Sequence, residues 1–245
     1  MKIIICEDER ELDIKAAEEF ANHIRRKPDS VLGLATGSTP IGMYKQLVDM
    51  HKNEGLDFSR VITFNLDEYV GIPHDHPCSY HAYMDENLFN HVNISRENIN
   101  IPNGLAESLE EECTNYEEKI KSVGGIDIQV LGIGRNAHIG FNEPGTPFHS
   151  ITSVVELTPS TREANSRFFD SIDEVPTHAI SMGIKTIMQA KKIILLAKGA
   201  DKADAMYKAL YGPITPDVPA SVLQLHPNVT VFVDKEAAAK FPTKE

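Results

Sequence analysis

The sequence has few cysteines, a shortage of basic residues and no long hydrophobic run. Its three cysteines among 245 residues are widely spaced and odd in number, which favours reduced thiols over a disulfide framework. Lysine and arginine number 24 against 36 aspartates and glutamates, so the net charge is -12. That sign argues against a surface that neutralises nucleic-acid phosphates or anionic lipid. No apolar run approaches the roughly 18 residues that span a bilayer, so we expect neither a nucleic-acid nor a membrane partner.

The chain also lacks a linker, an internal repeat and a low-complexity tract. Residues 1–8 turn acidic too early for a signal peptide, and together with the reduced cysteines this predicts a cytoplasmic protein. With 41% hydrophobic residues, a chain of this length removes roughly 70% of its unfolded surface from water. We therefore expect one domain over residues 1–245 that needs no disulfide or metal for stability.

Short β-branched runs alternate with longer segments of helical period. This alternation predicts an α/β fold, in which a parallel sheet is covered by helices on both faces. The expected strands are residues 2–6, 31–35, 61–66, 98–101, 126–133, 153–157, 193–197 and 229–233.

Apolar residues at helical spacing predict three of the helices. Within residues 12–26 the positions of Ala17, Phe20, Ala21 and Ile24 share one helix face, which must pack on the sheet. Two further stripes are expected to be buried in the same way. They are Leu109, Cys113, Tyr116 and Ile120, and Ala203, Met206, Tyr207 and Leu210.

Ligands of open α/β sheets bind beyond the carboxyl ends of the strands, so the residues that follow each strand carry most information. After the run at 31–35 come Thr36, Gly37, Ser38 and Thr39, then a helical pattern. Glycine lets the backbone approach a ligand, and free amides before a helix favour an anion. The sequence is no Walker motif, because no Gly-Lys-Ser/Thr follows. A phosphate cradle and a turn capped by Ser38 or Thr39 are equally open here.

The next strand end carries two adjacent carboxylates, Asp67 and Glu68. Burying them there is costly unless they are solvated, paired or used. A partly desolvated carboxylate beside a sugar can act as a general base. The alternative is an ordinary acidic loop in which Glu68 pairs with a lysine.

Residues 132–145 form the densest polar cluster. Their start matches the dinucleotide fingerprint G-x-G-x-x-A, but Gly140, Pro144 and further Gly and Pro residues exclude the helix that the fingerprint requires. What remains is Asn136, His138 and Glu143, an imidazole with an amide and a carboxylate that can orient it. The cluster suits proton transfer.

Two other groups are weaker candidates. His74, Asp75, His76, Cys78 and His81 are all competent metal ligands, but no second Cys/His pair stands at structural-zinc spacing, and Ser79 caps an expected helix over residues 79–91. We expect no metal. Arg167 and Lys202 could bind a phosphate, although a surface cation is the default for either residue.

Taken together, these segments resemble the glucosamine-6-phosphate deaminase family over nearly the whole chain. The resemblance implies a Rossmann-like three-layer α/β sandwich with a mostly parallel central sheet in a single domain. The residues that carry it are 34–40, 65–69, 79–81, 132–134, 138–144, 165–169 and 221–227.

The family converts glucosamine 6-phosphate and water to fructose 6-phosphate and ammonia without a cofactor. By resemblance, His138 opens the sugar ring with support from Glu143 and Asn136, and Asp67 moves a proton from C2 to C1. The resemblance also assigns the 6-phosphate to a set of six residues. They are Thr36, Gly37, Ser38, Thr39, Arg167 and Lys202.

Two departures from the family pattern limit what carries over. Other members often have aspartate where this chain has Asn136, so the pH profile does not transfer. The chain also ends soon after its last strand, as in the shorter, non-allosteric branch, and we expect a monomer, with a homo-oligomer as the alternative. Two rival functions are a 6-phosphogluconolactonase, which needs no carbon-acid base, and a sugar-phosphate sensor without catalysis.

Overall fold

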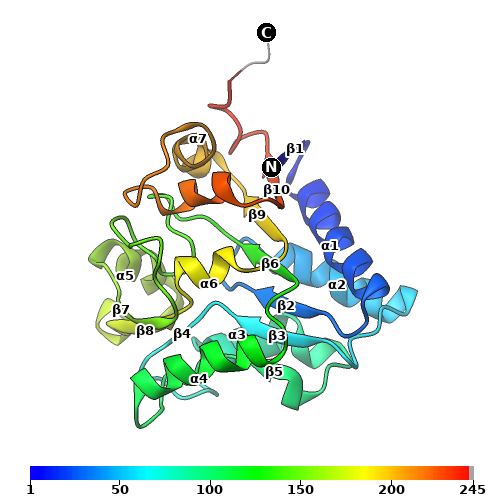
Figure 1. Cartoon of the computed structure of the whole chain (residues 1–245), viewed down its shortest axis with the longest axis vertical. Coiled ribbons are helices and arrows are strands. Elements are labelled where there is room, and N and C mark those ends of the chain that lie inside the picture. The colour runs from blue at the N-terminus through cyan, green and yellow to red at the C-terminus, as the bar shows by residue number, and fades with distance from the viewer. Residues whose placement is uncertain (243–245) are drawn as a thin grey trace.

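A seven-stranded parallel sheet runs through the middle of the molecule (Figure 1). The computed structural model describes residues 1–242, with no side-chain description for Ala164 and Phe168. Every neighbouring pair in this sheet is parallel. In spatial order the strands are β1 (Lys2–Cys6), β10 (Val229–Asp234), β9 (Ile193–Ala197), β6 (Ile128–Leu131), β2 (Val31–Leu34), β3 (Ile62–Asn65) and β5 (Ile99–Asn100). The predicted fold class, an α/β domain with a mostly parallel central sheet, is confirmed.

Helices lie on both sides of this sheet, with α1 and α2 together on one side and α6 and α7 on the other (Figure 1). The α-helices are α1 (Glu9–Arg26), α2 (Ile41–Glu54), α3 (Tyr80–Asn87), α4 (Leu109–Ser122), α5 (Pro159–Asn165), α6 (Ile184–Met188) and α7 (Ala203–Tyr211). Short 3-10 helices span Phe89–His91, Arg96–Asn98, Ser166–Phe168, Ile172–Glu174, Ala200–Lys202 and Pro219–Leu225. The predicted α1 face is confirmed, because Ala17, Phe20 and Ala21 are completely buried.

One predicted strand belongs to a different sheet. β7 (Ser153–Glu156) is not part of the parallel sheet but pairs antiparallel with β8 (His178–Ser181), which also pairs with β4 (Asp67–Tyr69). β4 and β8 were not among the expected strands. A β-branched run shows that a segment is extended but not which strand it pairs with, and β4, with two acidic residues in three positions, has no apolar run at all.

Two helix predictions also need correction. In α7 the residues Ala203, Met206 and Leu210 are buried as expected, but Tyr207 is 42% exposed. The helix expected over residues 79–91 ends at Asn87, and a separate 3-10 turn over Phe89–His91 follows it. Ser79 does cap it, since its hydroxyl accepts a hydrogen bond from the amide of Ala82.

The strand order fixes where a ligand can bind. From β2 the chain proceeds outward through β3 to β5, whereas from β6 it proceeds in the opposite direction through β9 to β10. The loops that follow β2 and β6 therefore diverge at the carboxyl edge of the sheet, which is the place where open α/β sheets bind ligands. These are the loops that contain Thr36 and His138.

A buried carboxylate ties the small sheet to α4. One oxygen of Glu117, Oε1, accepts hydrogen bonds from the amide of Thr152 at 2.9 Å, from its hydroxyl at 2.7 Å and from the Thr186 hydroxyl at 2.5 Å. All three residues are buried. Because Thr152 precedes β7 and Thr186 lies on α6, this one side chain anchors both elements.

We expect Glu117→Ala to lower the free energy of unfolding by about 3 kcal/mol, because it leaves buried donors without an acceptor. Urea denaturation at neutral pH measures this. The matched control is Glu118→Ala on the exposed face of the same helix, which should change stability by less than about 0.5 kcal/mol. Equal effects of the two substitutions would contradict the anchoring role.

Candidate active site

The loop after β2 lies at the carboxyl edge of the sheet and contacts α3. Gly37 has φ +87°, a left-handed conformation that favours glycine, and its carbonyl accepts a hydrogen bond of 2.6 Å from the Tyr83 hydroxyl on α3. The helix α2 begins after Pro40, and no side chain caps it. The alternative in which Ser38 or Thr39 caps the helix is therefore wrong. The uncapped amides here are suited to an anion.

Asp67 lies at the start of β4, directly after the turn from β3, and is only 6% exposed. Burial, together with the neighbouring charge of Glu68, raises the pKa of the Asp67 carboxyl to about 8. Among the described residues Glu68 pairs with no lysine, so the interpretation that gave it a lysine partner is wrong. Glu68 accepts a 2.8 Å hydrogen bond from Nδ1 of His81 and further bonds from backbone amides at the start of α3.

The loop after β6 holds His138 beside Glu143. Nδ1 of His138 lies 3.5 Å from Oε2 of Glu143, and the Asn136 amide donates a 2.6 Å hydrogen bond to that same oxygen. The other oxygen, Oε1, accepts a hydrogen bond of 2.5 Å from the Thr161 hydroxyl. Burial raises the pKa of Glu143, but His138, Thr161 and Asn136 outweigh it and lower the pKa to about 2. Asn136, His138 and Glu143 thus form one unit.

Asp67 and the His138 loop meet at Gly140. A Cβ added at Gly140 would lie 3.6 Å from Oδ2 of Asp67 and 3.2 Å from the Ser181 hydroxyl. Ser181 stands opposite Asp67 in the small sheet and accepts a hydrogen bond from the amide of Phe141. The buried Asn142 side chain donates to the carbonyls of Ile139 and Met182. The small sheet therefore holds the loop against Asp67.

Three cations gather on the same edge. Burial lowers the pKa of the Lys202 ammonium, and the charges of Arg135 and Arg167 lower it further against the opposing charge of Asp201. Asp201 pairs with Arg135 at 2.9 Å and with Lys202 at 3.8 Å. Asp201 thus pairs with two of the three cations. The structure brings Arg167 and Lys202 together as predicted, and adds Arg135.

Aromatic rings join the segments of the site. Tyr69 of β4 lies 4.8 Å from Tyr80 of α3 and 5.7 Å from Phe169, measured between ring centroids. Phe141, from the His138 loop, stacks on Tyr80 at 6.3 Å. This cluster connects Asp67, the His138 loop and the segment of Arg167. It was missed by sequence reasoning, although Tyr69, Tyr80 and Phe169 all lie within the motifs that carried the resemblance.

The histidine-rich segment is arranged as a stack. His74 and His81 lie face to face with their centroids 3.8 Å apart, and the Nδ1 atom of His76 accepts from the amide of Cys78. Within residues 1–242 no three His, Cys, Asp or Glu side chains come together as a metal site.

Thr158 and Thr161, which support Glu143, were also missed, because threonines at the start of a helix ordinarily serve as caps.

Residues 7–232 match the family described as glucosamine-6-phosphate isomerases/6-phosphogluconolactonase. A glucosamine-6-phosphate deaminase of Clostridium botulinum (strain Loch Maree) is 59% identical over 244 residues, which covers the whole of both chains. One of Thermoanaerobacter pseudethanolicus is 57% identical over 245 residues and is covered to 97%. A solved structure of a monomeric glucosamine-6-phosphate deaminase is 52% identical, with a TM-score of 0.96 over 98% of this chain and 99% of that one. A 6-phosphogluconolactonase from Trypanosoma cruzi, at 20% identity and a TM-score of 0.78, shares the fold.

Thr161→Val removes a donor to Glu143, so we expect the pKa of Glu143 to rise from about 2 toward its ordinary value of 4.5. A carboxyl with a lowered pKa stabilises the fold fully above pH 4.5, and this stability is lost as the pH falls toward 2. The variant should therefore be less stable by about 1 kcal/mol at pH 6, and this deficit should shrink below pH 4.5.

Thermal and urea unfolding between pH 3 and pH 6 measure the deficit. Ser160→Ala is the control, because the Ser160 hydroxyl contacts Thr158 and not Glu143. A deficit that stays constant with pH would show that Thr161 acts through packing alone.

Proposed function

The chain belongs to the family of glucosamine-6-phosphate isomerases and 6-phosphogluconolactonases, and from this membership we propose that it is a glucosamine-6-phosphate deaminase. The proposed reaction converts glucosamine 6-phosphate and water to fructose 6-phosphate and ammonia. It needs proton transfers and a held substrate, and no cofactor enters any step. Identities of 57% and 59% to named deaminases over full length support this activity over the lactonase of the same family.

The observation that carries the proposal is a pair of carboxyl groups with opposite proton affinities, one beside Gly140 and the other further along the same loop. The pKa of Asp67 is raised to about 8, whereas that of Glu143 is lowered to about 2. Two titratable groups whose environments separate their pKa values are typical of acid-base catalysis. Hydrolysis of a lactone gives no role to a carbon-acid base such as Asp67, whereas isomerisation requires one.

We assign ring opening to His138. The step moves a proton from the anomeric hydroxyl to the ring oxygen, and a neutral imidazole can accept and then donate it. Glu143, which stays ionised because of its lowered pKa, stabilises the imidazolium formed in between. Asn136 supports the pair by its bond to Glu143 and by accepting the His138 amide on its side-chain oxygen.

We assign the C2-to-C1 proton transfer to Asp67. In the free protein its raised pKa keeps a proton on the carboxyl at neutral pH, and the ammonium of an amino sugar placed next to it favours the ionised form. The carboxylate then removes the C2 proton, the electrons of that C–H bond form the C1–C2 double bond, and a proton of the ammonium passes to the C1 oxygen, which gives an enolamine. The same carboxyl returns its proton to C1. Water adds to the resulting C2 iminium, and ammonia leaves.

The substrate phosphate is assigned to residues 36–39 together with Arg167 and Lys202. The uncapped start of α2 supplies amide donors, and Lys202 lies near the guanidinium groups of Arg135 and Arg167. A phosphate held at the end of the sugar away from the reacting carbons orients the substrate, so its binding energy contributes to the rate.

We expect pure protein incubated with glucosamine 6-phosphate alone to release ammonia and fructose 6-phosphate in equal amounts. Asp67→Asn should reduce this by at least about 1,000-fold while sugar-phosphate affinity changes little, because the amide cannot accept the proton. Coupled assays for both products and calorimetric binding measure these quantities. Near-normal turnover of the variant would remove Asp67 from the mechanism.

The same substitution should also stabilise the fold. A carboxyl with a raised pKa favours folding fully below pH 3.8, and this contribution is lost as the pH rises to about 8. The unfolding free energy of Asp67→Asn should therefore exceed that of the parent protein by an amount that grows from pH 4 to pH 8. Loss of activity with no such gain would indicate a damaged fold rather than a missing base.

We further propose that the protein is a cytoplasmic monomer that binds a small sugar phosphate. Its support is the 52% identical solved structure, which is that of a monomeric deaminase, and the three cysteines, all of which are free. None of the helices in residues 1–242 is long and apolar enough to cross a membrane. Sedimentation at micromolar concentration should give one species of about 27 kDa, as the chain mass of 27.2 kDa requires. A stable hexamer would contradict this.

A further inference from the structure

Glu68, the residue next to Asp67, is held by four donors. Its Oε1 accepts from the amides of Tyr69 at 2.8 Å and Tyr80 at 3.0 Å, and its Oε2 accepts from the amide of His81 at 3.1 Å and from His81 Nδ1 at 2.8 Å. The Glu68 side chain is 1% exposed. His81 is the one side chain in this set, and it is the only donor in the set that a substitution can remove.

We propose that His81 is a positioning residue for the proposed deamination: by holding the Glu68 carboxylate with a side-chain hydrogen bond, it lets the adjacent Asp67 give up its proton and act as the base. The inference rests on the proposed function, since it deepens the role of Asp67. Nothing in the proton transfer itself requires His81 to touch the substrate.

The physical link is the repulsion between two neighbouring buried carboxylates. Two like charges in a site of low polarity raise the pKa of one of them, and the charge of Glu68 acts on Asp67 in this way. The other titratable groups around Asp67 are phenols, those of Tyr44, Tyr69, Tyr80 and Tyr116, which are neutral at physiological pH. Glu68 is therefore the charge that most affects the proton of Asp67, and His81 is the side chain that holds it.

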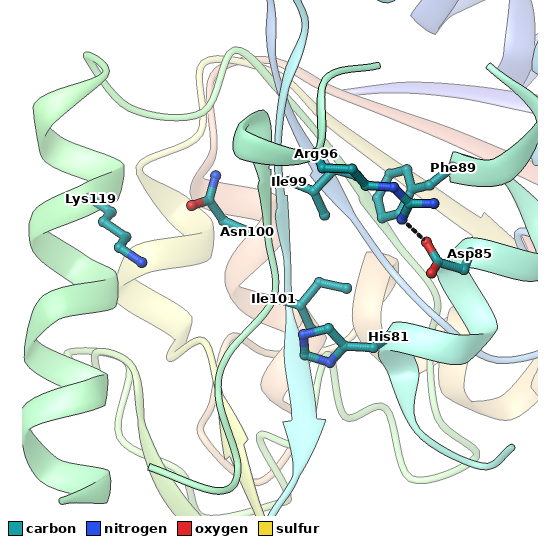
Figure 2. Close-up of a pocket in the computed structure, with 8 residues that line it drawn as sticks. All are labelled: His81, Asp85, Phe89, Arg96, Ile99, Asn100, Ile101 and Lys119. Atoms are coloured by element: carbon teal, nitrogen blue, oxygen red, sulfur yellow. Dashed lines mark hydrogen bonds and ion pairs between the residues drawn. The ribbon is translucent and has the colours of Figure 1, made fainter. Parts of the chain in front are cut away.

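His81 reaches this position from a surface hollow of about 230 Å³ beside α3 and β5 (Figure 2). The other charged residues that line the hollow are Asp85, Arg96 and Lys119, of which Asp85 and Arg96 pair with each other. The ring of His74 covers one face of the His81 ring and bonds to Asn103. Because the His81 side chain is 24% exposed, a smaller residue there opens the hollow further instead of creating a closed cavity in the core.

The test is the pH profile of His81→Ala, which removes the side-chain donor to Glu68. The low-pH limb of kcat/KM, which reports the ionisation of the base in the free enzyme, should move up by about one pH unit, with KM for glucosamine 6-phosphate at pH 9 changed less than about twofold. His91→Ala is the matched control, since the hydrogen bond described for the His91 side chain goes to a backbone carbonyl, and the low-pH limb of this variant should stay in place.

Glu68→Gln should shift the low-pH limb in the opposite direction. It removes the like charge, so the limb should move to lower pH, and in the double variant with His81→Ala the effect of His81 should vanish because no carboxylate remains to be held. An upward shift of the limb in His81→Ala that persists in the double variant, or an unchanged limb in His81→Ala, would overturn the proposal. If the parent protein released no ammonia, the proposed function itself would be wrong. The pH profiles of the variants test only the role of His81, so the two failures are distinguishable. Thermal melting confirms that each variant is folded.

Discussion

The burial of the Asp67 carboxyl at the junction of the two sheets is the constraint on which the rest of the site depends. A carboxylate in this place is unfavourable without compensation, and the chain provides no cation in contact with it among the described residues. The group therefore keeps a proton until a positive charge arrives. If the protein had paired Asp67 with a lysine, the fold would be more stable at neutral pH, but the base would be too weak to remove a proton from carbon.

Everything around Asp67 can be understood as maintaining this condition. The short strand β4 leaves the parallel sheet and pairs with β8, which places Ser181 opposite Asp67 and brings the His138 loop to it through Gly140. Glu117 anchors the far side of the same small sheet through Thr152. The small sheet is thus the part of the fold that turns an ordinary crevice at the carboxyl edge into a site with two differently protonated carboxyl groups.

The residues of the central sheet could be predicted from sequence because their signal is local. A buried parallel strand such as β9 is a continuous apolar run, and the buried stripe of α1 repeats with helical period. β4 and β8 carry no such signal, and some partners of the two glutamates are distant along the chain: Tyr80 lies 12 residues from Glu68 and Thr161 lies 18 residues from Glu143. Candidate residues could therefore be named from their loops, but the proton affinities of Asp67 and Glu143 depend on contacts that the local sequence does not encode.

Asn136 illustrates the difference between naming a residue and knowing what it does. The sequence shows an asparagine where other members of the family often have aspartate, which suggests only that a negative charge is missing. In the structure its amide donates to Glu143 while its side-chain oxygen accepts the His138 amide. An aspartate could accept but, when ionised, could not donate, and its charge would oppose the ionisation of Glu143 at a distance of 2.6 Å. The neutral Asn136 donor thus adds to the larger effects of His138 and Thr161 in lowering the pKa of Glu143, whereas no described residue donates to Asp67, whose pKa is raised.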